Sequence, residues 1–189
     1  VYGLGGNGLN KEASKKIYAA KGRPSDNPLI LHIADMEQFY PLIKTDNAKI
    51  IARAEALADV FWPGPLTMIL PKADNIPYET TGGLDTVAIR MPSHLVARAL
   101  LQECKMPIAA PSANLSGRPS PTSASHVIED MNGRIEMIID GGDVGIGVES
   151  TIIDLTGEVP MLLRPGFVTP EMLLSLIHIS EPTRPISIS

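Results

Sequence analysis

The sequence predicts a single α/β domain built on a mixed β-sheet that is flanked by helices. Two observations favour this fold class. Segments with a helical period alternate along the chain with short apolar segments that are typical of buried strands, and some of these strands are joined by loops alone. The length of 189 residues, with 44% hydrophobic and 20% charged residues, suits one globular domain with its own core.

Polar caps and apolar spacing mark the helices. Asn10 and Ser93 each precede a helical pattern and are placed to cap it. The clearest pattern runs from Ile50 to Phe61, where apolar residues recur at spacings of three and four and so form one stripe. The predicted helices cover 11–20, 47–61, 94–104 and 122–131.

Short apolar segments between Gly- and Pro-rich loops mark the strands. Helices and strands alternate, but not as strict βαβ units, which suggests a layered domain with a mixed sheet. The predicted strands cover 29–33, 66–70, 86–91, 107–110, 135–140, 151–155 and 161–164.

The two ends of the chain differ from the rest. Val1–Gly5 has the composition of the exit from a strand whose start is missing. At the other end "LSLIHISEPTR" matches the translation of an adapter used in sequencing libraries. We therefore predict one domain over residues 1–173 and a non-native tail over 174–189, which we exclude from fold reasoning.

Charge and cysteine content exclude several classes of function. A net charge of −5 argues against a surface built mainly to hold nucleic acid. The single cysteine, Cys104, permits neither a disulfide framework nor a cysteine-rich metal site. No apolar run approaches the roughly 20 residues that span a bilayer, so the cytoplasm is the predicted location.

A set of cationic and hydroxyl residues lies in loops next to the predicted strands, with no matching cluster of acids. Ligands in α/β sheets tend to bind at such strand ends, and several donors without acids suit a polyanion. From the residues alone the sequence predicts a phosphate or nucleotide site and goes no further. The residues are Lys21, Arg23, Arg90, Ser112, Asn114, Ser150, Thr151 and Arg164.

Several motifs, in order, resemble one known family. These are "VYGLGGNGLN", "KGRPSDNPLILHI", "FWPGPLTMIL", "VAIRMPSH", "PIAAPSANLSG", "GGDVGIGVESTIIDL" and "LLRPGFVT". They are similar to the YrdC/YwlC-type threonylcarbamoyl-AMP synthases over almost all of the chain to about Leu173. The resemblance implies a twisted YrdC-like sheet that encloses a large basic cavity. The family's "PTET" segment before "VYGLG" is absent, so the first strand is expected to be missing.

The resemblance also implies an activity and its site. L-threonine, bicarbonate and ATP would give threonylcarbamoyl-AMP and pyrophosphate, the first step toward N6-threonylcarbamoyladenosine in tRNA, and other proteins would transfer the product. Lys21 and Arg23 would be catalytic, and Mg²⁺ would be held mainly by the ATP phosphates, with no metal ligand from protein side chains. The implied ATP-binding residues are Lys21, Arg23, Ser112, Asn114 and Arg164, and those on the threonine and carbamate side are His32, Arg90, Ser150, Thr67 and Thr151.

Two alternatives stay open. The same fold serves as the carbamoyl-AMP-forming domain of a hydrogenase-maturation carbamoyltransferase, which needs no threonine. A non-catalytic RNA-binding module is the other, since a basic cavity could contact double-stranded RNA. The net charge of −5 and the lack of aromatic residues among the basic ones argue against the second.

Overall fold

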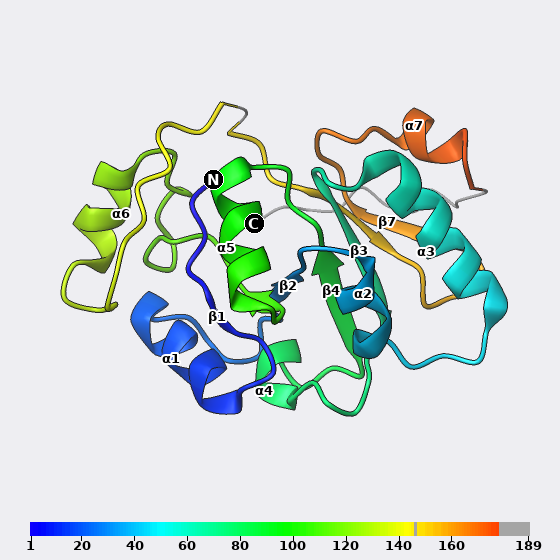
Figure 1. The fold of residues 1–189 in the computed structure, drawn as a ribbon, viewed down its shortest axis with the longest axis horizontal. Helices are drawn as coiled ribbons and strands as arrows, with labels where there is room; N and C mark the ends of the chain where they lie inside the picture. The colour runs from blue at the N-terminus through cyan, green and yellow to red at the C-terminus, as the bar shows by residue number, and fades with distance from the viewer. Residues whose placement is uncertain (146, 178–189) are drawn as a thin grey trace.

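The computed structural model describes residues 1–145 and 147–177. The described residues form one seven-stranded sheet in the order β1-β5-β2-β4-β3-β6-β7. In Figure 1, α1 and α6 lie at one end of the molecule and α3 and α7 at the other, with the central strands between them. The strands are β1 Gly6–Asn7, β2 Ile30–His32, β3 Leu66–Pro71, β4 Thr86–Arg90, β5 Ile108–Ala109, β6 Thr151–Asp154 and β7 Met161–Arg164. The helices are α1 Lys11–Lys21, α2 Met36–Phe39, η1 Tyr40–Leu42 (3-10), α3 Ala48–Phe61, α4 Tyr78–Thr81, α5 Leu95–Cys104, α6 Ala124–Met131 and α7 Pro170–Leu174.

The sheet is mixed, as predicted. β2 runs parallel to β4 and β3 runs parallel to β6, while the other neighbouring pairs are antiparallel. This arrangement brings the end of β2, the end of β4, the start of β3 and the start of β6 to one edge of the sheet, because β3 runs opposite to β4.

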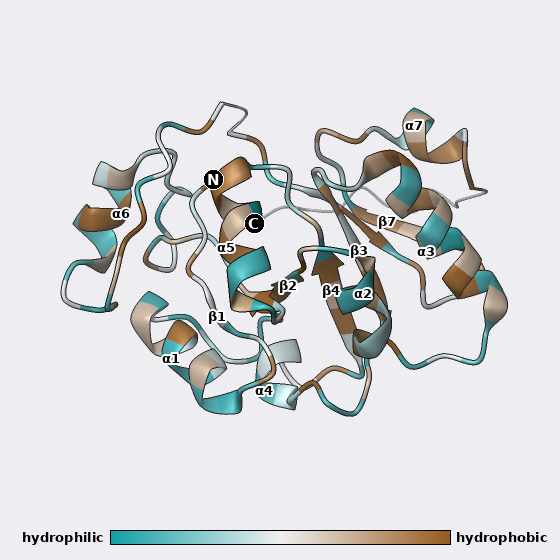
Figure 2. Ribbon diagram, in the orientation of Figure 1, coloured by the Kyte–Doolittle hydropathy of each residue, from teal (hydrophilic) through white to brown (hydrophobic). Residues whose placement is uncertain are grey.

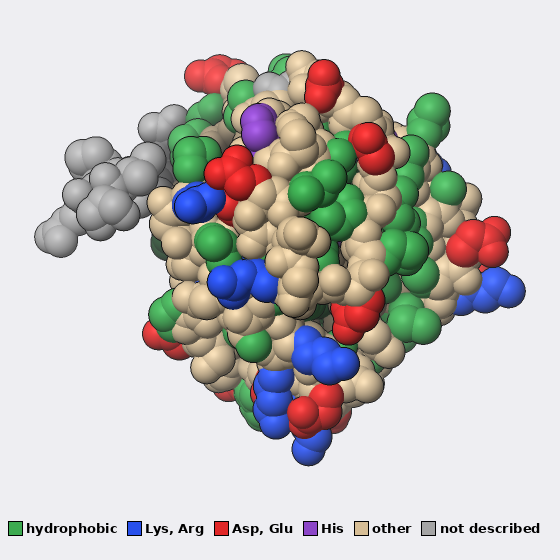
Figure 3. Space-filling model, turned by 90° about the vertical axis from the view of Figure 1, so that its left-hand side faces the viewer, with side chains coloured by type: hydrophobic (Ala, Val, Ile, Leu, Met, Phe, Trp, Pro, Cys, Tyr) green, Lys and Arg blue, Asp and Glu red, His purple; other side chains and the backbone are tan. Residues whose placement is uncertain are grey.

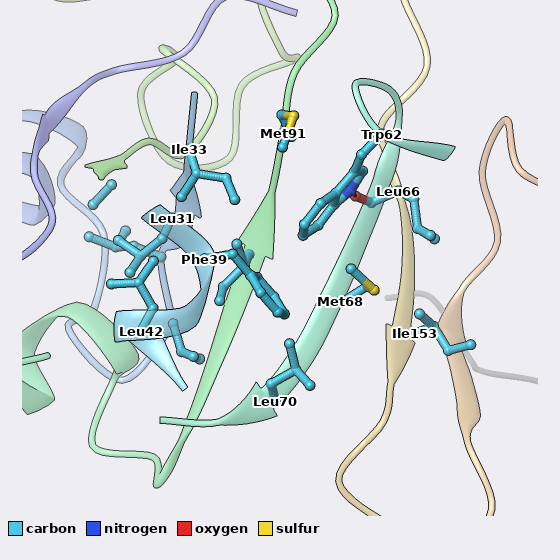
Figure 4. Close-up of a cluster of buried hydrophobic side chains, with 14 of the residues drawn as sticks. Leu31, Ile33, Phe39, Leu42, Trp62, Leu66, Met68, Leu70, Met91 and Ile153 are labelled. Atoms are coloured by element: carbon cyan, nitrogen blue, oxygen red, sulfur yellow. Dashed lines mark hydrogen bonds between the residues drawn. The ribbon is translucent and has the colours of Figure 1, made fainter. Parts of the chain in front are cut away.

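The core lies on one face of the sheet. Met68 of β3 is the register partner of Ile89 of β4, and neither side chain is exposed to solvent. Figure 4 shows Met68 together with Phe39 and Trp62, whose rings pack edge-to-face at 5.7 Å. Figure 2 shows β2 and β4 as hydrophobic, whereas hydrophobic and hydrophilic residues alternate along α3. Because side chains alternate along a strand, residues beside these core positions point to the opposite face.

The predicted helices begin and end for local reasons. Asn10 caps α1 as predicted, since its side chain accepts hydrogen bonds from the N–H groups of Glu12 and Ala13. Gly22 ends α1 in the left-handed conformation (φ 63°), where glycine has no Cβ to clash. For α3, Asn47 is the cap and accepts from Lys49 N. Ser93 is not a cap: α5 begins one residue later, after His94, without a side-chain cap hydrogen bond.

The predicted strand at 135–140 was wrong. These residues form an irregular surface segment, in which Met137 is 72% exposed. Ile135 and Ile138 pack against the core, but the backbone pairs with no strand. Instead, Tyr2 ties the end of the segment down, because its hydroxyl donates to Gly142 O at 2.7 Å.

The boundary of the predicted non-native tail falls in the last helix. Leu174 ends α7, and Ile177 is 8% exposed and belongs to the core cluster. Residues 178–189 lie outside the described residues, so the tail stays a prediction. None of the helices in the described part of the chain combines the length and hydropathy needed to cross a membrane.

Candidate functional site

The structure groups nine of the ten predicted site residues into two clusters. We call the first the helix-end cluster, because it lies where α1 ends and where the loop after β5 passes. We call the second the sheet-edge cluster, because it lies at the edge where β2, β4, β3 and β6 meet. The helix-end cluster is Lys21, Arg23, Ser112 and Asn114, and the sheet-edge cluster is His32, Thr67, Arg90, Ser150 and Arg164.

Lys21 is the last residue of α1, and only 3% of it is exposed. Its Nζ donates to the backbone oxygen of Ser112, to that of Asn114 at 2.7 Å, and to Asn114 Oδ1 at 3.4 Å. An ammonium has three N–H groups, so the loop engages all of them. Burial and then the Arg23 guanidinium lower the pKa of Lys21 to about 8, while Asp130 acts in the opposite direction. Lys21 therefore holds the loop and places a desolvated positive charge beside it.

Arg23 presents a guanidinium whose Nε has no hydrogen-bond partner among the described residues. It follows Gly22, and although the residue is only half-buried, this Nε is buried. Burial lowers the pKa of Arg23, and Tyr18 and Asp26 act weakly in the opposite direction. A buried donor without a partner costs about 1–3 kcal/mol. An anion can be bound only through the part of the half-buried side chain that stays exposed.

Asn114 folds the loop after β5. Its Nδ2 donates to the backbone oxygens of Leu115 and Arg118, each at 2.8 Å, so both amide hydrogens are used within the chain. Ser112 forms an isolated antiparallel bridge with Gly3 and gives its carbonyl to Lys21. The half-buried hydroxyl of Ser112 is therefore the group of this loop that remains for a ligand.

His32 and Arg90 are register partners at the ends of the parallel strands β2 and β4. His32 Nδ1 lies 3.2 Å from Ile30 O and must donate, because a carbonyl only accepts. Burial and then Arg90 lower the pKa of His32 to about 4, so the ring is neutral at pH 7. Arg90 Nε donates to Gly64 O at 3.2 Å, which fixes the guanidinium at the sheet edge. Burial and then Arg164 lower the pKa of Arg90.

Thr67 and Ser150 form a buried hydroxyl pair beside these cations. Their Oγ1 and Oγ atoms are 2.8 Å apart, and the two residues are 0% and 4% exposed. Arg164 lies over the pair: its Nη2 donates to Ser150 O at 2.8 Å and its Nη1 to Glu149 Oε2. Arg164 is thus bound to the chain segment that starts β6, and it positions Ser150.

Thr151 belongs to neither cluster. It is completely buried, its Oγ1 donates to Val168 O at 2.8 Å, and it accepts from Val168 N at 3.1 Å. These two bonds fasten the segment after β7 to β6. The Thr151 hydroxyl therefore already donates one hydrogen bond and accepts another within the chain. A role for Thr151 in binding threonine stays a prediction.

The segment before β1 connects the clusters. Tyr2 O accepts from Ala113 N at 2.8 Å, next to Ser112 of the helix-end cluster. Val1 lies near Arg90 and Glu149 of the sheet edge. The two clusters therefore flank one short stretch of chain.

Sequence reasoning missed two carboxylates at the site. Glu149 pairs with Arg164, and Asp130 accepts from Leu115 N at 3.0 Å in the loop that Lys21 holds. The position of Glu149 directly before Ser150 was the available signal, whereas nothing in the sequence placed Asp130 near Lys21.

Two hollows in the described surface lie away from these clusters. One, of about 550 Å³, lies between α1 and residues 134–136, and another, of about 490 Å³, lies near α2 and the end of α5; none of the ten predicted residues lines either. The predicted large basic cavity thus stays a prediction. In the described part of the chain no three His, Cys, Asp or Glu side chains are grouped as a metal site.

The arrangement is suited to anions rather than to hydrolysis by paired acids. Two guanidinium groups, Arg23 and Arg90, belong to the two clusters, and the carboxylate of Glu149 at the sheet edge is engaged by Arg164. Preorganised cations and hydroxyls of this kind stabilise charge that develops on phosphate or carboxylate groups.

Comparison with known proteins shows the family to which the chain belongs. The Sua5/YciO/YrdC family model, described as "Telomere recombination", matches residues 1–166. The chain is 61% identical over 166 residues to the threonylcarbamoyl-AMP synthase of Pyrococcus abyssi, which covers 88% of this chain and 48% of that protein. It is 56% identical over 178 residues to that of Bacillus subtilis, covering 94% and 50%. The chain spans about half the length of these curated relatives.

A solved structure shows the same fold. The crystal structure of Pyrococcus abyssi Sua5 in complex with L-threonine superposes with a TM-score of 0.87 at 56% sequence identity. The match covers 95% of this chain and 53% of that one.

Proposed function

Because the chain belongs to the Sua5/YciO/YrdC family, we propose that it is the catalytic part of a threonylcarbamoyl-AMP synthase. In this reaction the amine of L-threonine and bicarbonate give a carbamate and water. A carbamate oxygen then attacks the α-phosphorus of ATP, and the bond from that phosphorus to the bridging oxygen breaks. Pyrophosphate leaves, and threonylcarbamoyl-AMP remains for transfer to a tRNA adenosine by other proteins.

The observation that carries the proposal is the pair of clusters with complementary chemistry. The helix-end cluster suits the nucleotide, since Arg23 has an unsatisfied buried donor and Lys21 adds a desolvated charge beside the Ser112 hydroxyl. Phosphoryl and nucleotidyl transfer depends on positioning and on neutralising charge, which these groups supply.

The sheet-edge cluster suits the amino acid. Arg90 can pair with the threonine carboxylate, because the hydrogen bond that holds it, from Nε to Gly64 O, uses one of its three nitrogens. His32 is neutral at pH 7, so it adds no further positive charge next to Arg90 and leaves room for an amine. The Thr67–Ser150 pair can orient the substrate hydroxyl or the carbamate.

Mg²⁺ would enter with the ATP. The helix-end cluster itself offers cations, hydroxyls and amides, and the Asp130 carboxylate beside it is already engaged by Leu115 N and Arg118. The carboxylate oxygens that usually hold Mg²⁺ are therefore not free there. The residues present therefore do not form a protein-held magnesium site, and we assign the ion to the phosphates. The cytoplasmic location also stays a prediction.

Pyrophosphate release by the full-length gene product tests the proposal. We expect release from ATP to require both L-threonine and bicarbonate, and to fall at least about tenfold in Arg23→Met, because a charge-assisted contact is lost. Lys49→Met removes one positive charge from the exposed side of α3 and should leave the rate unchanged.

The alternatives give different results in the same assay. Pyrophosphate release that needs no threonine would point to the carbamoyltransferase. Salt-sensitive retention of RNA with no pyrophosphate release would point to the RNA-binding module. Figure 3, which shows the side that carries α1 and α6, has Lys and Arg side chains interspersed with Asp and Glu and no single basic patch. This face gives the RNA-binding alternative no support.

A further inference from the structure

Asp130 of α6 is a largely buried carboxylate outside the residues already assigned. It is 8% exposed, its Oδ2 accepts from Leu115 N at 3.0 Å, and its Oδ1 accepts from Arg118 Nη1 at 2.6 Å. The Leu115 N–H and then the Arg118 guanidinium lower the pKa of Asp130, so it is charged at neutral pH.

The two residues that Asp130 holds are the ones that Asn114 also holds. Asn114 Nδ2 donates to Leu115 O and to Arg118 O, both at 2.8 Å. Asp130 thus binds the N–H of one residue and the side chain of the other, while Asn114 binds their carbonyls. Residues 114–118 are fixed from both sides.

The same loop is joined to the end of α1. Lys21 Nζ donates to Asn114 O at 2.7 Å, and Lys21 O accepts from Ser116 N at 2.9 Å. The hydrogen bonds therefore run without a break from Asp130 through the loop to Lys21. Asp130 is also the one carboxylate whose charge favours the ammonium form of Lys21.

We propose that Asp130 is a positioning residue for the helix-end cluster, which fixes the loop of residues 112–118 against Lys21 and so sets the affinity for the nucleotide. This inference rests on the proposed function. Asp130 does not touch the ligand; it acts through the loop that presents Ser112 and through the charge of Lys21. Without its carboxylate, Arg118 would lose its near-buried partner, and Lys21 would face Arg23 with less compensation.

The substitution Asp130→Asn tests the inference. Asparagine keeps the size of the side chain and can still accept from Leu115 N, but it removes the charge. The matched control is Glu129→Gln on the same helix, because Glu129 also contacts Arg118, at 3.4 Å, and is exposed. The probe is α,β-methylene-ATP, whose Kd is measured by calorimetry on the full-length protein, with L-threonine as the second ligand.

We expect Asp130→Asn to raise the Kd of α,β-methylene-ATP roughly tenfold, as for the loss of one charge-assisted contact, and to leave the Kd of L-threonine unchanged. Glu129→Gln should leave both affinities unchanged.

The pH profile of nucleotide affinity is a second readout. The charged groups around Lys21 are Arg23 and Asp130, with Arg134 nearby through its contact with Ala20 O. Removal of the negative charge should shift the alkaline loss of nucleotide affinity to lower pH.

Three results would overturn the inference. They are an unchanged nucleotide affinity and pH profile in Asp130→Asn, an equal effect of Glu129→Gln, and an equal loss of threonine affinity, which would indicate general unfolding. Melting temperatures measured in parallel identify the last case. If the unaltered protein binds no analogue and releases no pyrophosphate, the proposed function fails and the inference fails with it. If the unaltered protein is active and Asp130→Asn has the same nucleotide affinity and pH profile as that protein, only the inference fails.

Discussion

Replacing Lys21 by methionine removes the ammonium but keeps an unbranched side chain of similar length, and two effects on stability oppose each other. Burial holds the pKa of Lys21 near 8 instead of 10.5, which corresponds to about 3 kcal/mol of destabilisation at neutral pH that methionine would relieve. Methionine would also leave the part-buried carbonyl of Ser112 and the buried carbonyl of Asn114 without their donor, at up to about 1–3 kcal/mol each. We therefore expect the free energy of unfolding to fall by no more than about 3 kcal/mol.

Nucleotide binding should change much more than stability. Without the charge and the loop contacts of Lys21, we expect the Kd of α,β-methylene-ATP to rise at least tenfold, in line with the loss of a charge-assisted contact. In the unaltered protein the affinity should also fall as the pH rises through about 8, where Lys21 loses its proton. Calorimetry between pH 7 and 9 measures both effects on folded protein.

The pH dependence of stability has a defined sign. The pKa of Lys21 is lower in the folded than in the unfolded chain, so the unfolded chain binds more protons between about pH 8 and 10.5. The free energy of unfolding should therefore gain a contribution from Lys21 as the pH rises through this window, and Lys21→Met should lack it. Urea unfolding at several pH values compares the two proteins.

The control is Lys16→Met, which removes a lysine from the same helix at an exposed position. If Lys21→Met and Lys16→Met bind the analogue equally well, the argument that a buried ammonium organises the nucleotide loop is refuted. An unchanged affinity of the unaltered protein across pH 8 would refute the low pKa instead.

Three further predictions concern the sheet edge. Arg90→Met should raise the KM for L-threonine at least about tenfold and leave the Kd of α,β-methylene-ATP unchanged, because a charge-assisted bond to the carboxylate is lost; equal effects on both ligands would contradict this. Thr151→Val should lower the free energy of unfolding in urea by about 1–3 kcal/mol, since both polar groups of Val168 lose a buried partner, with the KM for threonine unaltered. Gly64→Ala would put a Cβ 2.3 Å from Phe61 O, so the turn must move; the melting temperature should fall and, because Gly64 O holds Arg90, the KM for threonine should rise. An unchanged melting temperature and KM would show that the turn accommodates a side chain.

The fold class and most elements follow from the sequence because they depend on local patterns. The stripe from Ile50 to Phe61 gave α3, which begins one residue later than predicted. The segment 135–140 misled, because its apolar residues pack against the core from an irregular backbone that has no neighbouring strand to pair with. The spacing of apolar residues indicates which side chains are buried. It does not indicate whether a neighbouring strand is available for the segment to pair with.

The sequence predicted which residues form the candidate site but not which partners their side chains bind. The sequence and the family resemblance together named the cations and hydroxyls that the structure gathers into two clusters. Neither could show that the Nζ of Lys21 donates its hydrogen bonds to one loop, because its acceptors include backbone carbonyls about ninety residues away in the sequence. For the same reason the role of Asp130 was not predicted, since Lys21, on which its charge acts, is far away in the sequence. The pairing of Glu149 with Arg164 depends on β6 and β7 lying side by side.

The hydrogen bonds divide the four cations of the site into two kinds. Lys21 and Arg164 are bound to the chain: the first holds the loop that carries Ser112, and the second holds the start of β6. Arg23 has a buried donor without a partner in the described chain, and Arg90 is held through Nε alone. A guanidinium that the protein has desolvated without satisfying gains most from a bound anion. We therefore expect Arg23 and Arg90 to contact phosphate and carboxylate directly, and substitutions of Lys21 and Arg164 to act on binding through the loops that these residues position.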